Sequence, residues 1–158
     1  MNEEDIKKLK NLSSTIRKIN GKITLIALLE KAKKEYDQNK LNDCERTCRE
    51  ILKVNPNNAI ALRGIGCVFQ SNGDNKNAIK YYKRALEFSN NKEIEYTLIG
   101  TVYYNENDLE NAIEYYNKAI DINDDYSSAY EGKNQSILER HLQILDLQDN
   151  LIQRNLFK

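Results

Sequence analysis

The sequence predicts an all-α fold, a right-handed solenoid of helix-turn-helix repeats, and three observations predict it. The 158-residue chain contains an ungapped 34-residue repeat, in which residues 59–92 and 93–126 are identical at eleven of 34 positions, where about two identities are expected for unrelated sequences. Apolar residues in both copies recur at helical spacing. With one Pro and six Gly, the chain has too few turn residues for an all-β protein.

Charge and hydropathy exclude several classes of function. The 24 basic residues balance 24 acidic ones, whereas a general nucleic-acid binder needs an excess of Lys and Arg. The longest near-apolar run, residues 23–29, is far shorter than the ~20 residues of a membrane span, and the acidic first residues do not form a secretory signal. Three Cys fit a reducing compartment. We therefore predict a cytoplasmic protein with no nucleic-acid or membrane partner.

The N-terminal element, residues 1–24, is expected to form an amphipathic helix ahead of the repeats. Its apolar residues are spaced three or four apart, and Asn20-Gly21 is a stop signal. The sequence thus predicts one helix over residues 3–19. The apolar residues of this helix are Ile6, Leu9, Leu12, Ile16 and Ile19.

The repeat array occupies residues 25–126, as copies at 25–58, 59–92 and 93–126. Each copy predicts two helices joined by a short turn. Gly73 is expected to end a first helix in the left-handed conformation, and Asn39 and Asn107 hold the same place in the other copies. Asp74 and Asp108 come next, where each is suited to cap a second helix.

The last element, residues 127–158, is predicted as one long helix that caps the array. Terminal units of solenoids cover the exposed edge of the last repeat, and residues up to about Leu142 suffice for this. The large apolar residues beyond would form an exposed patch, which usually marks an interface. We expect them to meet a second chain, or else to fold back on helix 3–19. They are Leu145, Leu147, Leu151, Ile152, Leu156 and Phe157.

Residues at fixed offsets in the repeats resemble a known family, the tetratricopeptide repeats. The third copy has Tyr96, Ile99-Gly100, Tyr103, Asn107, Ala112, Tyr116 and Ala119, and the second has Leu62, Ile65-Gly66, Phe69, Gly73, Ala78, Tyr82 and Ala85. The resemblance covers 102 of 158 residues. The first copy departs, with Lys31, Glu35 and Cys44 where Leu, Tyr and Ala are usual, so its first helix is expected to pack in a shifted way through Tyr36.

The resemblance implies a peptide-binding groove, because first helices of this family line its concave face. The subclass that clamps the C-terminal carboxylate of large heat-shock chaperones would need basic residues and Asn where this chain has Leu29, Gly64, Ile94 and Leu98, with only Lys33 basic. We therefore predict no binding of such chaperones. The groove residues implied are Leu29, Lys33, Tyr36, Ile60, Arg63, Gly64, Cys67, Ile94, Thr97, Leu98, Thr101, Tyr104 and Asn105.

Nothing in the sequence assembles a catalytic or metal site. His141 has no Ser, Cys or Asp partner at a defined spacing. Cys44 and Cys48 are four apart, but a zinc site needs three or four ligands, so we interpret them as buried core thiols. We predict a non-enzymatic protein with no catalytic residue, no metal and no cofactor.

The charge is unevenly distributed. Residues 1–92 carry a net charge of +8, and residues 93–126 carry nine acidic and one basic residue, net −8. One interpretation is lateral pairing of Lys76 and Lys80 with Glu110 and Glu114, each worth about 0–1 kcal/mol. The other is a bipolar surface that orients a partner.

Three hypotheses of function follow. The first is an adaptor, scaffold or chaperone-like module that binds a protein segment in the concave groove, and the second is a self-assembling subunit that dimerises through its last helix. The third, the targeting part of a larger enzyme, is weakened because the chain starts at Met1 and its last helix looks complete as a cap.

Overall fold

The computed structural model describes the backbone of residues 3–156, and the side chains of this stretch except those of residues 3, 5, 6, 9, 155 and 156. This part of the chain is all-α and contains no strand, as the sequence predicts. Its helices are α1 (Glu3–Asp37), α2 (Leu41–Val54), α3 (Ala59–Ser71), α4 (Asn75–Phe88), α5 (Lys92–Asn105), α6 (Leu109–Ile122) and α7 (Ser127–Leu156).

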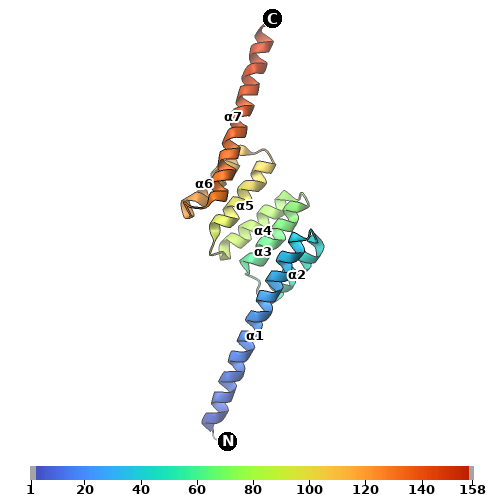
Figure 1. Cartoon of the computed structure of the whole chain (residues 1–158), viewed down its shortest axis with the longest axis vertical. Helices are drawn as coiled ribbons and strands as arrows, with labels where there is room; N and C mark the ends of the chain where they lie inside the picture. The colour runs from blue at the N-terminus through green and yellow to red at the C-terminus, as the bar shows by residue number, and fades with distance from the viewer. Residues whose placement is uncertain (1–2, 157–158) are drawn as a thin grey trace.

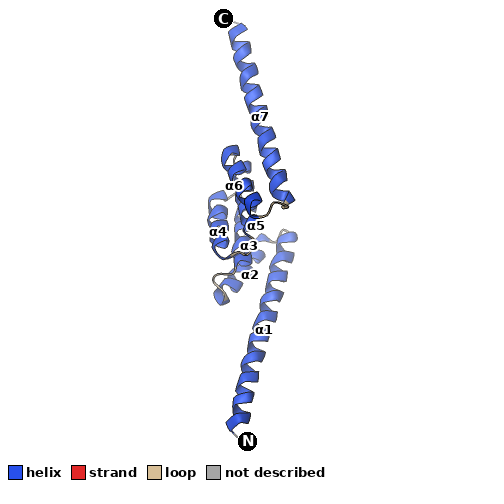
Figure 2. Ribbon diagram, turned by 90° about the vertical axis from the view of Figure 1, so that its left-hand side faces the viewer, coloured by secondary structure: helices blue, strands red, loops and turns tan. Residues whose placement is uncertain are grey.

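The helices form a solenoid of stacked pairs (Figure 1). The C-terminal part of α1 packs on α2, α3 on α4, and α5 on α6, while the first half of α7 packs on α6 and α5. The outer parts of α1 and α7 leave this body in opposite directions (Figure 2). The alternative in which the end of α7 folds back on the N-terminal helix is therefore wrong.

The expected end of the N-terminal helix at Asn20-Gly21 is also wrong, because α1 runs without a break to Asp37. A Gly inside a helix costs only about 1 kcal/mol relative to Ala, which is too little to end a helix that continues on both sides. Thr24 Oγ1 also donates a hydrogen bond to the carbonyl oxygen of Asn20, at 2.9 Å. The predicted boundary at residue 24 thus lies within one continuous helix.

The predicted turns within the repeats are confirmed. Asn39, Gly73 and Asn107 all have positive φ, of 56°, 78° and 60°. Asp74 and Asp108 cap the helices that follow, since their carboxylates accept hydrogen bonds from backbone N–H groups three residues on, at 3.1 and 3.2 Å. These caps satisfy donors that the first turn of a helix leaves without partners.

A glycine in the first helix of a repeat faces a tyrosine ring from the second helix. A Cβ atom at Gly66 would lie 2.5 Å from Cε1 of Tyr82, and one at Gly100 would lie 2.9 Å from Cε1 of Tyr116. Gly132 of α7 also approaches Tyr116, where a Cβ would lie 2.5 Å from Cε1. The glycines therefore allow the rings to fill the space between helices, and α7 covers the end of the array through the same contact.

The first repeat keeps this register despite its altered residues, so the expected shift in its packing is wrong. Ala32 holds the place of Gly66 and is 5% exposed. Glu35, in the place of a family Tyr, is buried and accepts a hydrogen bond from Thr47 Oγ1 at 2.7 Å. Because the carboxylate finds this partner, a Glu is accommodated at an inward position.

We expect Gly66→Ala to lower the free energy of unfolding by about 1–3 kcal/mol, because the added methyl overpacks the core against the Tyr82 ring. The matched control is Gly21→Ala, where no atom lies within 4 Å of the added Cβ. Urea titration followed by circular dichroism measures both. Equal stability of the two variants would contradict the role given to the glycine–tyrosine contact.

Candidate functional site

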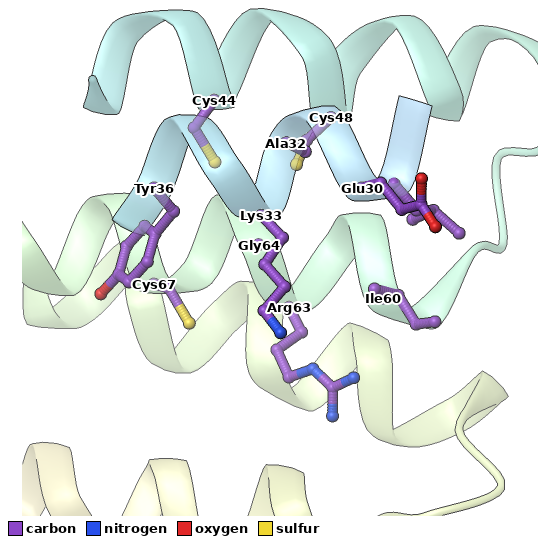
Figure 3. A pocket seen from close by; sticks show the side chains of 11 residues that line it. Glu30, Ala32, Lys33, Tyr36, Cys44, Cys48, Ile60, Arg63, Gly64 and Cys67 are labelled. Atoms are coloured by element: carbon purple, nitrogen blue, oxygen red, sulfur yellow. The ribbon is translucent and has the colours of Figure 1, made fainter. Parts of the chain in front are cut away.

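A pocket of about 380 Å³ opens between α1 and α3, with α2 behind it. Figure 3 shows Tyr36 and Ile60 at opposite ends of the pocket, with Lys33 and Arg63 extending from α1 and α3 toward its mouth. The lining is mostly apolar. Its residues are Leu29, Glu30, Ala32, Lys33, Tyr36, Cys44, Cys48, Ile60, Arg63, Gly64 and Cys67.

The pocket exists because the first repeat lacks the tyrosine that fills this space elsewhere. Cys48 holds the repeat position of Tyr82 and Tyr116. The Tyr82 hydroxyl donates to Gln70 Oε1 at 2.7 Å, and the residue 34 positions before Gln70 is Tyr36, which lines the pocket. A thiol in place of a phenol ring leaves the corresponding volume open in the first repeat.

The inner wall of the pocket is neutral and tightly packed. Burial raises the pKa of the Cys48 thiol to about 12 and also raises the pKa of Cys44 and Cys67, so all three remain protonated at neutral pH. A Cβ at Gly64 would lie 2.7 Å from Cys48 Sγ. Only glycine at this position lets α3 approach α2 without displacing the thiol.

The rim of the pocket supplies the polar groups. Lys33 is exposed, and it forms no ion pair with any side chain that the structure describes. Tyr36 is 37% exposed, and its hydroxyl shares a hydrogen bond with Ser71 Oγ at 3.1 Å. Glu30, which is also exposed, lies near Ile60 at the other end of the pocket (Figure 3). The apolar interior therefore suits an apolar group, and the Lys33 side of the mouth suits an anionic group next to it.

The structure brings together only part of the groove that the sequence implies. The residues from the first two repeats line this one pocket, whereas those of the third repeat do not. Thr97 is buried, and Leu98 packs against the core formed with Tyr82 and Val102. Leu98 is half-buried in the packing between the second and third repeats and does not line this pocket. Ile94, Thr101 and Tyr104 are half-buried, and Asn105 is exposed.

Sequence reasoning missed a buried carboxylate that pairs with Arg63 of the pocket wall. Glu95 is 0% exposed, and its Oε1 lies 3.3 Å from Nη1 of Arg63. Neither carboxylate oxygen has a hydrogen-bond partner among the described residues, and the positive N-terminal end of α5 favours a carboxylate in its first turn. A signal was available, because Glu95 stands where the second repeat has the fully buried Ala61.

The expected lateral pairing of the second helices is wrong. Within residues 3–156 no ion pair joins Lys76 or Lys80 to Glu110 or Glu114, and Glu114 pairs instead with Lys118 of its own helix. The bases on α4 and the acids on α6 therefore remain as separate surfaces.

The outer part of α7 carries the apolar residues that the sequence assigns to an interface. Leu145, Leu151 and Ile152 are 55–58% exposed, whereas the side chain of Leu156 and the whole of Phe157 lie outside the described residues. His141 is exposed on the same helix. Among the described residues, no three His, Cys, Asp or Glu side chains are grouped as metal ligands require, and no helix there is long and apolar enough to cross a membrane.

Family models of the tetratricopeptide repeat match residues 29–93 and 94–126, which is more than half of the chain. No curated protein sequence matches it.

Several solved structures share this fold at less than 25% identity. The Thermobaculum terrenum O-GlcNAc transferase is 24% identical with a TM-score of 0.67, over 72% of this chain but only 22% of that one. The first tetratricopeptide repeat domain of Spaghetti (RPAP3), bound to an HSP90 peptide, is 14% identical with a TM-score of 0.66. The match covers 74% of this chain and 93% of that one. The Yersinia enterocolitica type III secretion chaperone SycD, bound to a peptide of the translocator YopD, is 14% identical with a TM-score of 0.65, over 74% and 95%.

We expect Arg63→Met to lower the free energy of unfolding by about 3 kcal/mol, because the buried Glu95 carboxylate loses its cation. Replacing Glu95 by Gln in the same chain should recover most of this loss. The control is Arg46→Met, which removes an Arg that is 65% exposed and paired with Asp43, and which should cost at most about 1 kcal/mol. If the losses in unfolding free energy of Arg63→Met and Glu95→Gln simply add in the double variant, Arg63 and Glu95 are not coupled.

Proposed function

The chain belongs to the tetratricopeptide repeat family, and on this premise we propose that it is a non-enzymatic protein-interaction module that binds a segment of another protein in the pocket between α1 and α3. The observation that carries the proposal is the open volume left where Cys48 replaces the repeat tyrosine. In support, two solenoids of the same fold are bound to peptides. The role in the cell, as adaptor, scaffold or chaperone-like protein in the cytoplasm, is part of this proposal.

The pocket selects its ligand by shape and charge. An aromatic side chain from a partner would occupy the space that the repeat tyrosine fills in the other repeats, against the neutral thiols of Cys44 and Cys48. An acidic residue next to it would pair with Lys33 at the rim. A C-terminal carboxylate would find only Lys33 and none of the several donors of a carboxylate clamp, because Leu29 and Gly64 provide no side-chain donor.

Filling the pocket from within tests this function. Cys48→Tyr combined with Ala32→Gly recreates the glycine–tyrosine pair of the other repeats, so it should close the pocket and keep the fold. We expect peptides selected from a displayed library on the natural protein to contain an aromatic residue beside an acidic one. Their affinity should fall about ten-fold or more in the filled variant, as expected for loss of an anchoring aromatic.

The matched control is Val54→Tyr, which adds the same ring at a site that is 85% exposed and outside the pocket. This variant should bind the selected peptides as the natural protein does. Thermal unfolding of both variants checks that the fold is kept. Selected peptides that bind equally to the filled variant would place their site elsewhere and contradict the proposal.

Self-assembly through α7 is a second candidate function, favoured by the exposure of Leu145, Leu151 and Ile152. If it is correct, the double variant Leu145→Asp with Leu151→Asp should have a lower mass in solution than the natural protein. Gln148→Asp with Asn150→Asp adds the same charge at exposed polar positions of the same helix and should leave the mass unchanged. A mass that is the same in both variants would remove this candidate.

A further inference from the structure

The part of α1 that extends from the body carries an apolar stripe that no other described residue covers. Figures 1 and 2 show this stretch apart from every other labelled helix. Large aliphatic side chains are among those most often buried in a folded protein. Five of them here are each 48–60% exposed, namely Leu12, Ile16, Ile19, Ile23 and Ile26.

The spacing of the stripe is that of a coiled-coil seam. The steps between successive members are four, three, four and three, and Leu9 continues the pattern in the sequence. A strict repeat of 3.5 residues winds slowly around a straight helix, by about 20° per heptad. A second helix in a left-handed supercoil follows such a stripe along its whole length, whereas a flat membrane surface contacts only part of it.

The stripe faces away from the body. Where α1 meets the array, the residues that pack on the first core cluster include Leu25, Leu28 and Ala32. At 100° per residue, Ile23 and Ile26 lie on the opposite side of the helix from Leu25 and Leu28. A partner helix on the stripe therefore does not collide with α2.

We propose that α1 forms a parallel coiled coil with α1 of a second copy of this chain. In heptad terms the seam has Leu9, Ile16 and Ile23 at a, and Leu12, Ile19 and Ile26 at d. Every a and d position from residue 9 to residue 26 is apolar, so two identical helices bury the same layers. The two bodies then lie on the outer sides of the seam.

The residues beside the seam favour identical, parallel helices. The e positions, Ser13, Asn20 and Ala27, are uncharged, and Lys8 and Lys22 are at g positions. In a parallel pair each g residue meets an e residue of the partner, so each Lys faces Ser or Ala. In an antiparallel pair Lys8 would face Lys22, which is a repulsive contact.

Solution mass tests the proposal. Sedimentation velocity of the full chain over a range of concentrations should show an assembly of two to four chains, because Ile at both a and d positions shifts parallel coiled coils toward three or four strands. Ile16→Asp with Ile23→Asp should reduce the mass to one chain. The matched control, Asn11→Asp with Ser14→Asp, adds the same charge at exposed positions off the seam and should keep the larger mass.

A cross-link tests the orientation. Leu12→Cys lies opposite the same residue in a parallel pair, and opposite Ile23 in an antiparallel pair, where a and d positions share the core layers. Oxidation should therefore yield a covalent dimer of Leu12→Cys but not of Ser14→Cys, which lies on the outer face of the helix. This readout also decides the question if the Asp variants fail to fold, as judged by circular dichroism.

Other outcomes would overturn the proposal. One is the mass of a single chain at every concentration. The other is a larger mass that persists in the variant Ile16→Asp with Ile23→Asp but falls to that of one chain in the variant Leu145→Asp with Leu151→Asp. Binding of the single chain to phosphatidylserine-containing vesicles, without self-association, would identify the stripe as a membrane contact. Failure of peptide binding in the pocket has no effect on these measurements, so the two proposals fail separately.

Discussion

The packing of this array depends on the contact between a glycine of the first helix of a repeat and a tyrosine ring of its second helix. Gly66 with Tyr82, and Gly100 with Tyr116, set how closely the two helices of a repeat approach. Tyr116 also lies against Gly132, so the contact that joins helices within a repeat also joins the array to α7. Where the first repeat departs from this pair, with Ala32 and Cys48, the chain gains a pocket. The candidate site thus lies where the first repeat lacks the tyrosine ring that fills the same position in the other two repeats.

Much of the fold could be predicted because it is repeated. A second copy of a pattern confirms the first, and for this reason the turn residues Asn39, Gly73 and Asn107 and the caps Asp74 and Asp108 were all identified. The stop at Gly21 occurs once, without a second copy to test it. It failed because a local signal worth about 1 kcal/mol does not outweigh a long run of helix-forming residues.

The candidate site was harder to predict, since it depends on differences between copies and on contacts between distant residues. Sequence alone indicated seven of the eleven residues that line the pocket, but not Glu30, Ala32, Cys44 and Cys48. Glu95 is an ordinary helix residue by composition. Its burial against Arg63 is visible only by comparison with Ala61 in the preceding copy. Departures from a repeat carry more information about a site than the repeat itself does.

The continuity of α1 has a mechanical consequence. The helix that presents Leu29, Lys33 and Tyr36 to the pocket is the same rigid rod that leaves the body. At 1.5 Å per residue, the 30 steps along the helix from Glu3 to Lys33 span about 45 Å. Torque applied to the outer end of such a rod turns the wall of the pocket with it, because no hinge lies between them. Any restraint on the outer segment is therefore also a restraint on the width of the pocket mouth.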